Sequence, residues 1–263
     1  MDLGLTSRTA FVSGSTQGIG YAIAAALAAE GARVVLNGRD QDRVDAAVER
    51  LRAAHPGAEV SGIAADFADP VEVAGLIDTL PEVDVLVNNV GLFGLADFDA
   101  VDDDEWARYL DVNLMSGVRL SRALLGPMLD RGWGRVVFIS SESGVNVPVD
   151  MVHYGVTKAA VVALGNGLAK RTRGTGVTVN TVLGGPTYSD GVASTVEAIA
   201  AAQGAPAEAV RAAVIGQNHT TLLERFIAPE EIAHLVTYLA SPLASATNGA
   251  AVRADGGVLT GIL

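Results

Sequence analysis

Three residues in the middle of the chain have the types and the spacing needed for proton transfer. Tyr154 and Lys158 are four positions apart, so a helix through both would place the phenol and the ammonium on one face. A neighbouring cation favours a phenolate, so we expect Lys158 to lower the pKa of Tyr154 below about 10, the value of a free phenol. Ser141 lies just after an apolar, β-branched run, 135–139, that is typical of a buried parallel strand. Its hydroxyl could reach the space beside the phenol and the ammonium.

A glycine-rich turn near the start of the chain predicts a nucleotide-binding site. Residues 13–20 read Ser-Gly-Ser-Thr-Gln-Gly-Ile-Gly and connect a predicted strand, 9–13, with a predicted helix, 18–30. Glycines at such a turn let the backbone approach a pyrophosphate, and the helix N-terminus supplies N–H donors. The spacing Gly-x3-Gly-x-Gly differs from the common dinucleotide fingerprint, and a purely structural turn is the alternative.

The end of the second predicted strand, 33–37, indicates which dinucleotide would bind. An acid here suits the ribose 2′-hydroxyl of NAD, whereas an arginine suits the 2′-phosphate of NADP. The chain has Gly38 and Arg39 at this point and no acid before Asp40. We therefore favour NADP(H), with NAD(H) as the alternative. In the less specific interpretation, Arg39 is a solvated loop residue and Asp40 only caps the next helix.

Composition argues against several classes of function. The 263 residues carry a net charge of −12, which disfavours nucleic acid and anionic membranes as partners. No apolar run is long enough to cross a membrane, and the start of the chain lacks a signal-peptide pattern. The absence of cysteine excludes thiolate chemistry and fits a cytoplasmic protein. The four histidines lack metal-ligand spacing, and the acidic run 102–105 is expected to cap a helix, so we expect no metal site.

Alternating strands and helices must position these residues. Short apolar runs separated by helical segments are typical of βαβ units. They predict an α/β fold, a Rossmann-type doubly wound parallel sheet of about seven strands with helices on both faces. No linker divides the chain, so we expect a single domain, residues 1–263. The predicted strands are 9–13, 33–37, 60–65, 83–87, 135–140 and 177–182, and the clearest predicted helices are 18–30, 40–54, 69–79 and 229–240.

With this arrangement, the chain resembles the short-chain dehydrogenase/reductase (SDR) family over nearly its whole length. It is especially similar to members that resemble 3-ketoacyl-carrier-protein reductases. The resemblance implies an NAD(P)-dependent oxidoreductase that transfers a hydride between NADP(H) and a carbonyl compound or secondary alcohol. The matching motifs occur in one ordered set: Ser13-Gly14-x3-Gly18-x-Gly20, Asp66, Asn88-Asn89-Val90-Gly91, Asn113, Ser141, Tyr154-x3-Lys158 and Asn180.

The resemblance also implies catalytic roles for four residues. Tyr154 would be the general acid in reduction and the general base in oxidation. Lys158 would lower the pKa of Tyr154 and bind the nicotinamide ribose. Ser141 would hold and polarise the carbonyl oxygen, and Asn113 would anchor a water in a proton relay behind Lys158.

Further residues are implied to bind the cofactor or the substrate. The substrate pocket would include Glu142, Ser143 and Tyr188. The implied cofactor-binding set is Gly14, Ser15, Thr16, Gln17, Gly18, Ile19, Gly20, Arg39, Asp66, Phe67, Asn89, Gly91, Tyr154, Lys158, Gly185, Thr187 and Ser189.

Three positions depart from the family pattern. Ser13 stands where the family usually has threonine, and because it keeps the hydroxyl we expect little change. Val90 stands where the family usually has alanine, and we expect its extra bulk to tighten the cofactor channel slightly. Gly184 stands where the family usually has proline. A glycine frees φ, so we expect a more mobile loop on the nicotinamide side, which bears on the roles of Thr187 and Ser189.

The later part of the chain implies a lid and a subunit contact. Residues 188–226 form an insertion where the family builds a substrate lid. The apolar stretch 258–263 is expected to be exposed and suggests a subunit contact. The family is commonly tetrameric, so a homotetramer is implied. The sequence identifies neither the substrate nor the stereospecificity.

Alternatives remain open for several residues and for the function. Ser140 competes with Ser141, although adjacent strand residues face opposite ways and the family spacing selects Ser141. Asn113 could simply satisfy backbone groups inside a helix, and His153 is expected to be a neighbour without a catalytic role. The alternative functions are an NAD-dependent alcohol dehydrogenase of the same family and a catalytically silent nucleotide-binding protein.

Overall fold

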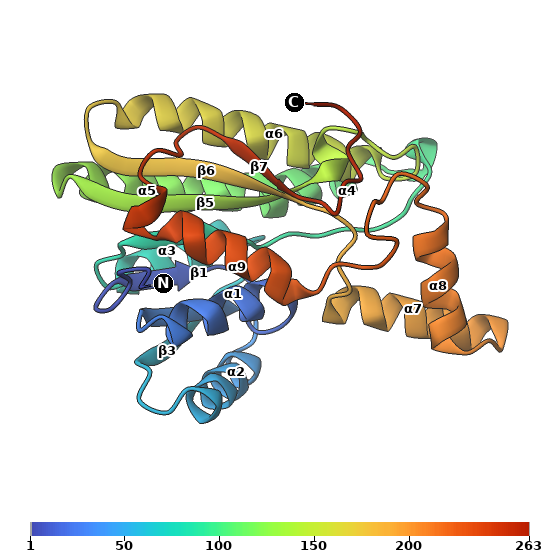
Figure 1. Ribbon diagram of the computed structural model, residues 1–263, viewed down its shortest axis with the longest axis horizontal. Coiled ribbons are helices and arrows are strands. Elements are labelled where there is room, and N and C mark those ends of the chain that lie inside the picture. Colours follow the sequence, from blue (N-terminus) through green and yellow to red (C-terminus); the bar gives the residue numbers. More distant parts are fainter. Residues whose placement is uncertain (1, 263) are drawn as a thin grey trace.

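A parallel sheet of seven strands lies at the centre of the computed structural model, which describes residues 2–262 (Figure 1). Its strand order is β3-β2-β1-β4-β5-β6-β7, and every paired register is parallel. The order reverses between β1 and β4, which is where doubly wound sheets bind ligands. The predicted Rossmann-type α/β fold is confirmed. The strands are β1 (Thr9–Val12), β2 (Arg33–Gly38), β3 (Val60–Ala64), β4 (Val85–Asn88), β5 (Trp133–Ser141), β6 (Gly176–Gly184) and β7 (Ala251–Ala254).

Helices cover both faces of the sheet, and short helical turns join several of them (Figure 1). The α-helices are α1 (Gly18–Ala29), α2 (Gln41–Ala54), α3 (Pro70–Thr79), α4 (Asp103–Leu110), α5 (Ser116–Asp130), α6 (Val152–Ala169), α7 (Asp190–Gln203), α8 (Ala207–Gly216) and α9 (Pro229–Ala240). The short turns are η1 (Phe98–Ala100), η2 (Asp111–Met115), η3 (Glu142–Gly144), η4 (Lys170–Thr172) and η5 (Pro242–Ala244), of which η2 is a π-helical turn.

Alternate residues of each strand contribute to two separate cores. Val12 packs with residues of α1, α2 and α9 on one face, whereas its neighbour Phe11 packs with residues of α3, α5 and α6 on the other. Both faces are therefore buried, which explains why the strands appear in the sequence as continuous apolar runs. The strands hold their carboxyl ends at one edge, where the loops can meet.

The predicted helix boundaries follow from capping. Asp102 caps α4 by accepting a hydrogen bond from the Glu105 N–H at 2.8 Å, so the acidic run begins a helix as expected. Asp40 likewise caps α2 by accepting from the Arg43 N–H at 2.9 Å. Gly31 has a φ of +82° just after α1, in the left-handed region that glycine adopts without strain.

Gly184 lies inside a strand, so its expected place in a mobile loop is wrong. It is the last residue of β6, buried, and paired with Ser141 of β5 and Ala254 of β7. Pairing to β7 extends β6 beyond the predicted end at Val182. The strand β7 was not predicted, because it is short, only partly buried, and carries Arg253 in an otherwise small apolar run.

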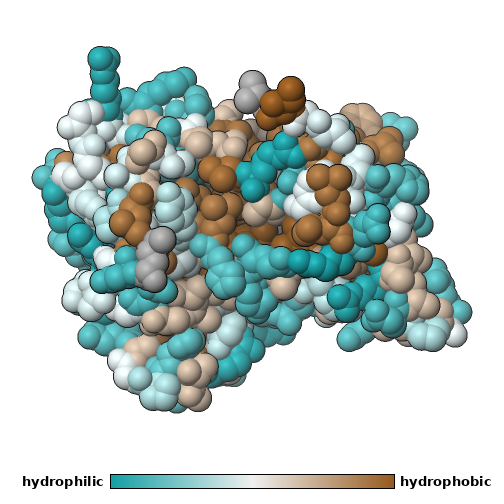
Figure 2. Space-filling model, viewed as in Figure 1, coloured by the Kyte–Doolittle hydropathy of each residue, from teal (hydrophilic) through white to brown (hydrophobic). Residues whose placement is uncertain are grey.

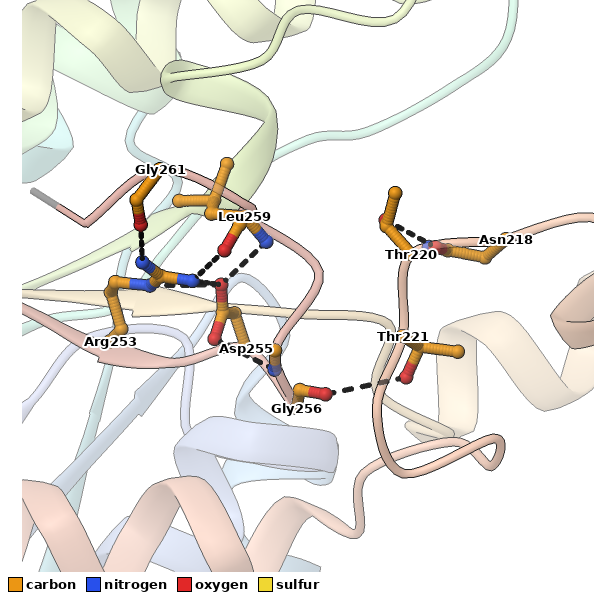
Figure 3. Close-up of polar contacts among 9 residues, drawn as sticks. Asn218, Thr220, Thr221, Arg253, Asp255, Gly256, Leu259 and Gly261 are labelled. Carbon is orange, nitrogen blue, oxygen red and sulfur yellow. Dashed lines mark hydrogen bonds and ion pairs between the residues drawn. The ribbon is translucent and has the colours of Figure 1, made fainter.

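The C-terminal segment is only partly the exposed apolar tail that we expected. Val258 is buried, whereas Ile262 is fully solvated with 99% of its surface exposed. Asp255 orders the turn by accepting from the Gly257 and Leu259 N–H groups at 3.1 and 3.0 Å (Figure 3). Arg253 pairs with Asp255 and donates to carbonyl groups farther along the segment.

The segment 188–226 forms two helices that project beyond the sheet. In Figure 1, α7 and α8 stand apart from the layers that cover the strands. They share a small apolar cluster formed by Val196, Ala200 and Val210, separate from the two large cores. The last loop of the segment 188–226 returns to the body of the protein, where the Leu222 N–H donates to the Gly256 carbonyl at 2.9 Å. In the part of the chain that the structure describes, no helix is long and apolar enough to cross a membrane.

Candidate active site

The carboxyl end of β5 and the first turns of α6 bring together the expected Ser, Tyr and Lys. Ser140 points away from the phenol, because its hydroxyl donates to the Lys158 carbonyl at 2.8 Å. The Ser141 hydroxyl points the other way and interacts with the hydroxyl of Tyr154. The Lys158 ammonium lies 5.6 Å from the centre of the Tyr154 ring. The alternation of strand residues thus places Ser141, and not Ser140, beside Tyr154.

The expected lowering of the pKa of Tyr154 by Lys158 is wrong for this structure. Burial raises the pKa of Tyr154 to about 12, although Ser141 partly opposes this by hydrogen bonding. The nearby charge of Glu142 raises the Tyr154 pKa further. The cost of removing a phenolate from water is the largest cause of this shift, and the charge of Lys158 is not among its causes.

Lys158 is fully enclosed and is held by the strand beneath it. Its ammonium donates to the Ile139 carbonyl at 3.0 Å, and burial lowers its pKa to about 8. Gly91, in the loop after β4, lies against it, since an added Cβ there would be 3.2 Å from the Lys158 Nζ. The absence of a side chain at Gly91 therefore keeps space open in front of the lysine.

Asn113 connects three elements behind Lys158. It lies in the π-helical turn η2, and its side-chain oxygen accepts from the Leu92 N–H at 2.6 Å. Its amide nitrogen donates to the Leu92 carbonyl at 3.0 Å and to the Thr157 hydroxyl at 2.9 Å. Both amide protons of Asn113 are thus engaged. The backbone groups that its side chain binds belong to Leu92 in the loop after β4, and not to the helix that carries Asn113.

The glycine turn has the conformation that its residues suggest. Gly14 and Gly18 have φ values of +60° and +59°. Gly20 allows α1 to lie against the turn, because an added Cβ would be 2.3 Å from the Gly14 carbonyl oxygen. Asn89 fixes the turn by donating to the carbonyls of Ser13 and Gly14 at 3.0 and 2.9 Å.

Val90 links this turn to the lysine. Its side chain packs on Gly14, where an added Cβ would be 3.3 Å from a Val90 methyl, and Gly91 follows directly against Lys158. The loop after β4 therefore lies between the turn and the catalytic candidates. The expectation that Val90 tightens the cofactor channel stays a prediction.

Several expected cofactor residues use their side chains inside the protein. The Ser15 hydroxyl donates to the Val12 carbonyl at 2.7 Å, and the Phe67 ring is part of a large core. The Asn37 N–H donates to the same Ser15 hydroxyl at 3.0 Å. The side chains of Ser15 and Phe67 are therefore engaged inside the protein, and the Ser15 N–H also donates to the Asn37 carbonyl, at 2.8 Å. Arg39 is exposed directly after β2, and Asp66 is partly exposed after β3.

The nicotinamide-side candidates lie where β6 leaves the sheet. Gly185 approaches the Asp255 main chain so closely that an added Cβ would be 2.4 Å from its carbonyl oxygen. The Thr187 hydroxyl donates to the Gly185 carbonyl at 2.9 Å, and Ser189 precedes the first turn of α7. Tyr188 packs against Phe226 and the cluster of α7 and α8, and its place in the substrate pocket stays a prediction.

Glu142 and Ser143, the other two pocket candidates, follow Ser141 in η3. The Ser143 N–H donates to the Ser141 hydroxyl at 3.1 Å. Burial raises the pKa of Glu142, while hydrogen bonds from Ser143 and Ser141 oppose the shift. His153 faces away from this group, with its ring 4.3 Å from that of Tyr109.

Two functional candidates were missed by sequence reasoning. The carboxylate of Asp190, the first residue of α7, accepts from the Gly18 N–H at 2.6 Å. Arg50 donates to the Thr16 carbonyl at 3.0 Å. Neither carries a sequence signal, because both contacts join residues far apart in the chain. Among the described residues, no group of three or more His, Cys, Asp or Glu side chains could hold a metal ion.

The fold and these motifs define a class of protein. The family model of the short chain dehydrogenases matches residues 8–200, so the chain belongs to the short-chain dehydrogenase/reductase family and is an oxidoreductase of that family.

Individual relatives agree with this assignment. The chain is 43% identical over 263 residues to the uncharacterized oxidoreductase YvaG of Bacillus subtilis, with 100% of both chains covered. It is 32% identical over 267 residues to 3-oxoacyl-(acyl-carrier-protein) reductase FabG of Aquifex aeolicus, covering 98% of this chain and 100% of the relative. The crystal structure of L-sorbose reductase from Gluconobacter frateurii, complexed with NADPH and L-sorbose, aligns over 100% of both chains with a TM-score of 0.94 at 30% identity. The expected family and its likeness to ketoacyl-carrier-protein reductases are confirmed.

Proposed function

We propose that the protein transfers a hydride between NADP(H) and a carbonyl compound or the corresponding secondary alcohol, with Tyr154 as the general acid and base. One observation carries the proposal: Ser141, Tyr154 and Lys158 meet at the carboxyl end of β5, next to the loop after β4. That loop packs on the glycine turn through Val90, so the proton-transfer group and the proposed dinucleotide site share one edge of the sheet.

The glycine turn fits a dinucleotide. The space outside Gly18 is open, since an added Cβ would meet only the Ser189 side chain, at 3.5 Å. The Gly18 N–H already binds the carboxylate of Asp190, which supports an anion at this helix N-terminus. A nicotinamide cofactor bound here would supply or accept the hydride.

The side chains around Tyr154 suit the protonation steps. A pKa of about 12 keeps Tyr154 protonated at neutral pH, so it can donate its proton to a carbonyl oxygen during reduction. Ser141 can donate a hydrogen bond to the same oxygen and stabilise the negative charge that develops there. Oxidation needs the phenolate form of Tyr154. The rate of alcohol oxidation should therefore increase with pH over a range in which the rate of carbonyl reduction does not increase.

Arg39 supports NADP(H) over NAD(H). It is exposed at the end of β2, and guanidinium binds phosphate through paired hydrogen bonds. One structural neighbour, L-sorbose reductase, was solved in complex with NADPH. These two observations favour NADP(H) for this chain, while NAD(H) is the alternative.

Replacing Arg39 by alanine tests the preference. We expect Arg39→Ala to raise the Kd of NADPH about 10- to 100-fold and that of NADH less than about 3-fold, as measured by quenching of protein fluorescence. Arg43→Ala, which removes another exposed arginine of the same region, is the control and should change neither value. Equal losses for both cofactors in Arg39→Ala would contradict the NADP(H) assignment.

We further propose that residues 188–226 act as a lid over the site. The small separate cluster of α7 and α8 supports movement of this segment as a unit, and Asp190 connects it to the glycine turn. The homotetramer and the cytoplasmic location stay predictions.

A further inference from the structure

We propose that Asp190 is a positioning residue that fastens the lid, residues 188–226, to the glycine turn and thereby lowers the KM for the ketone. The proposal rests on the proposed function and its lid, because it names the contact that keeps that lid closed. It uses three features of the described residues: the contact of Asp190 with the glycine turn, the contacts of its two neighbours, and the hinge of the lid.

The start of α7 lies on the start of α1. The Asp190 carboxylate accepts a hydrogen bond from the Gly18 N–H at 2.6 Å. The Ser189 side chain lies over the same glycine, where an added Cβ would be 3.5 Å from the Ser189 Cβ. A carboxylate is a stronger acceptor than a neutral oxygen, and the N-terminus of a helix favours a negative charge. Asp190 therefore holds the lid at the residue where the glycine turn becomes a helix.

This contact leaves other donors of the turn for the dinucleotide. The first N–H groups of a helix have no acceptor within the helix. Asp190 binds the N–H of Gly18, whereas those of Ile19 and Gly20 donate to no acceptor within residues 2–262. A cofactor pyrophosphate and Asp190 can therefore bind the same turn through different N–H groups.

The next residue extends the contact to the loop after β4. Gly191 lies against the ring of Phe93, where an added Cβ would be 3.4 Å from a ring carbon. Phe93 follows two residues after Gly91, which lies in front of Lys158. The consecutive residues 189–191 therefore join the lid both to the proposed cofactor site and to the loop beside the catalytic lysine.

The two ends of the lid form one hinge. The Tyr188 N–H donates to the Ile227 carbonyl at 2.9 Å, and the Ile227 N–H donates to the Pro186 carbonyl at 2.8 Å. The helices α7 and α8 therefore project from a common base. The bond between Asp190 and Gly18 is exposed to solvent, and neither residue belongs to a large core, so this bond can open without disturbing the cores.

The other side of the lid is attached by apolar contacts with the C-terminal turn. Leu223 lies against Gly256, where an added Cβ would be 3.2 Å from a Leu223 methyl, and Leu222 lies against Gly257 at 2.5 Å from its Cγ. The Thr221 hydroxyl donates to the Gly256 carbonyl at 3.5 Å (Figure 3). Hydrophobic residues gather next to the C-terminal segment in Figure 2. Loss of the Asp190 contact should therefore free the α7 side of the lid while the α8 side stays attached.

Amide hydrogen exchange tests the contact in the free protein. Asp190→Ala removes the acceptor and should raise the exchange rates in α7 about 3- to 10-fold. Asp190→Asn keeps an acceptor oxygen and should recover most of the protection. Glu197→Ala, which removes another exposed carboxylate of α7, is the control and should change these rates less than about 2-fold.

The asparagine variant separates this contact from an effect within α7. Asp190 is the first residue of α7, where a negative charge favours the helix itself. Asp190→Asn loses that charge but keeps the acceptor, so equal acceleration by Asp190→Asn and Asp190→Ala would overturn the proposal. Unchanged exchange of α7 in Asp190→Ala would overturn it as well. If Asp190→Ala does not fold, the Gly18 amide of the wild-type protein decides, because exchange as fast as in an unstructured peptide overturns the contact.

Steady-state kinetics test the consequence for the ketone. A lid that is closed for a smaller fraction of the time lowers the apparent affinity for a ligand that it covers. Asp190→Ala should therefore raise the KM for ethyl 3-oxobutanoate about 3- to 10-fold and leave kcat within about 2-fold of wild type. It should not raise the Kd of NADPH, because it removes a negative charge near the proposed pyrophosphate site. A raised Kd of NADPH with an unchanged KM for the ketone would overturn the proposed role.

The outcomes separate this inference from the proposed function. Absence of turnover for every ketone with either cofactor, in the folded wild-type protein, would overturn the proposed function. The exchange measurements need no turnover, so they would still decide whether Asp190 fastens the lid to the glycine turn.

Discussion

Burial is the main cause of the opposite pKa shifts of Tyr154 and Lys158. It raises the pKa of the phenol to about 12 and lowers that of the ammonium to about 8. Spacing in the sequence predicted their proximity but gave the wrong direction for Tyr154. The reason is physical: two residues four positions apart indicate a Coulomb interaction, whereas desolvation depends on every element that packs around them.

A buried charged lysine should make the site less stable than it would be with a neutral residue. Lowering a pKa from 10.5 to about 8 corresponds to about 3 kcal/mol at pH 7. Lys158→Met relieves this cost but also removes the hydrogen bond to the Ile139 carbonyl, which offsets part of the gain in stability. The substitution should therefore raise the free energy of unfolding by about 1–2 kcal/mol at pH 7. It should also abolish turnover.

The pH dependence identifies the cause of that gain. The folded wild-type protein loses the costly proton near pH 8, whereas the unfolded chain keeps it to about pH 10.5, so wild-type stability from this group rises between these values. The advantage of Lys158→Met should therefore shrink between pH 7 and pH 9.5 in urea unfolding. Lys170→Met, at an exposed lysine, should stay within about 0.5 kcal/mol of wild type. A constant advantage of Lys158→Met at both pH values would contradict the desolvation argument.

At the scale of elements, the glycine turn was predictable because it combines a strand, a turn and a helix in immediate succession. The apolar runs located six strands to within a few residues. The exceptions have physical causes: β7 is short and only partly buried, and main-chain pairing with β7 carries β6 through Gly184. The π-helical turn that holds Asn113 was not predicted, and the contacts of Asn113 join it to Leu92 and Thr157, which are distant in the sequence.

Gly20 is the position where the turn leaves least space. A methyl group there would be 2.3 Å from the Gly14 carbonyl oxygen and 2.5 Å from the Asn89 amide nitrogen. Gly20→Ala should lower the free energy of unfolding by about 1–3 kcal/mol and weaken NADPH binding, measured by urea unfolding and by fluorescence titration.

A second glycine provides the control. Gly75 lies inside α3 with nothing within 4 Å of an added Cβ. Gly75→Ala should therefore raise the free energy of unfolding by about 0.5–1 kcal/mol without affecting NADPH binding. Similar effects of the two substitutions would show that space around Gly20 is not what requires glycine.

At the scale of the whole molecule, the sequence predicted the sheet and its two covered faces but not the contacts between distant segments. Asp190 binds Gly18 across 172 positions of sequence, and the loop after α8 meets the C-terminal turn at Gly256. Such contacts depend on the tertiary fold. Local spacing therefore located the catalytic candidates, while the arrangement of the lid required the structure.

The lid should be the least stable large part of the molecule. The cluster of α7 and α8 contains few buried side chains, whereas β5 is buried in the middle of the sheet. Amide hydrogen exchange should therefore be faster in residues 190–216 than in β5, and saturating NADPH with a ketone should slow it in the lid. Equal protection of the lid and β5 in the free protein would argue against a moving lid.

The most direct test of the central claim is steady-state reduction of ethyl 3-oxobutanoate with NADPH by the wild-type protein and by Tyr154→Phe. The substitution keeps the ring and removes the phenolic hydroxyl, and with it the proton that Tyr154 is proposed to donate. We expect turnover by the wild type and a kcat about 10³-fold lower in Tyr154→Phe, with NADPH still bound. Turnover by Tyr154→Phe at the wild-type rate would show that Tyr154 is not the proton donor.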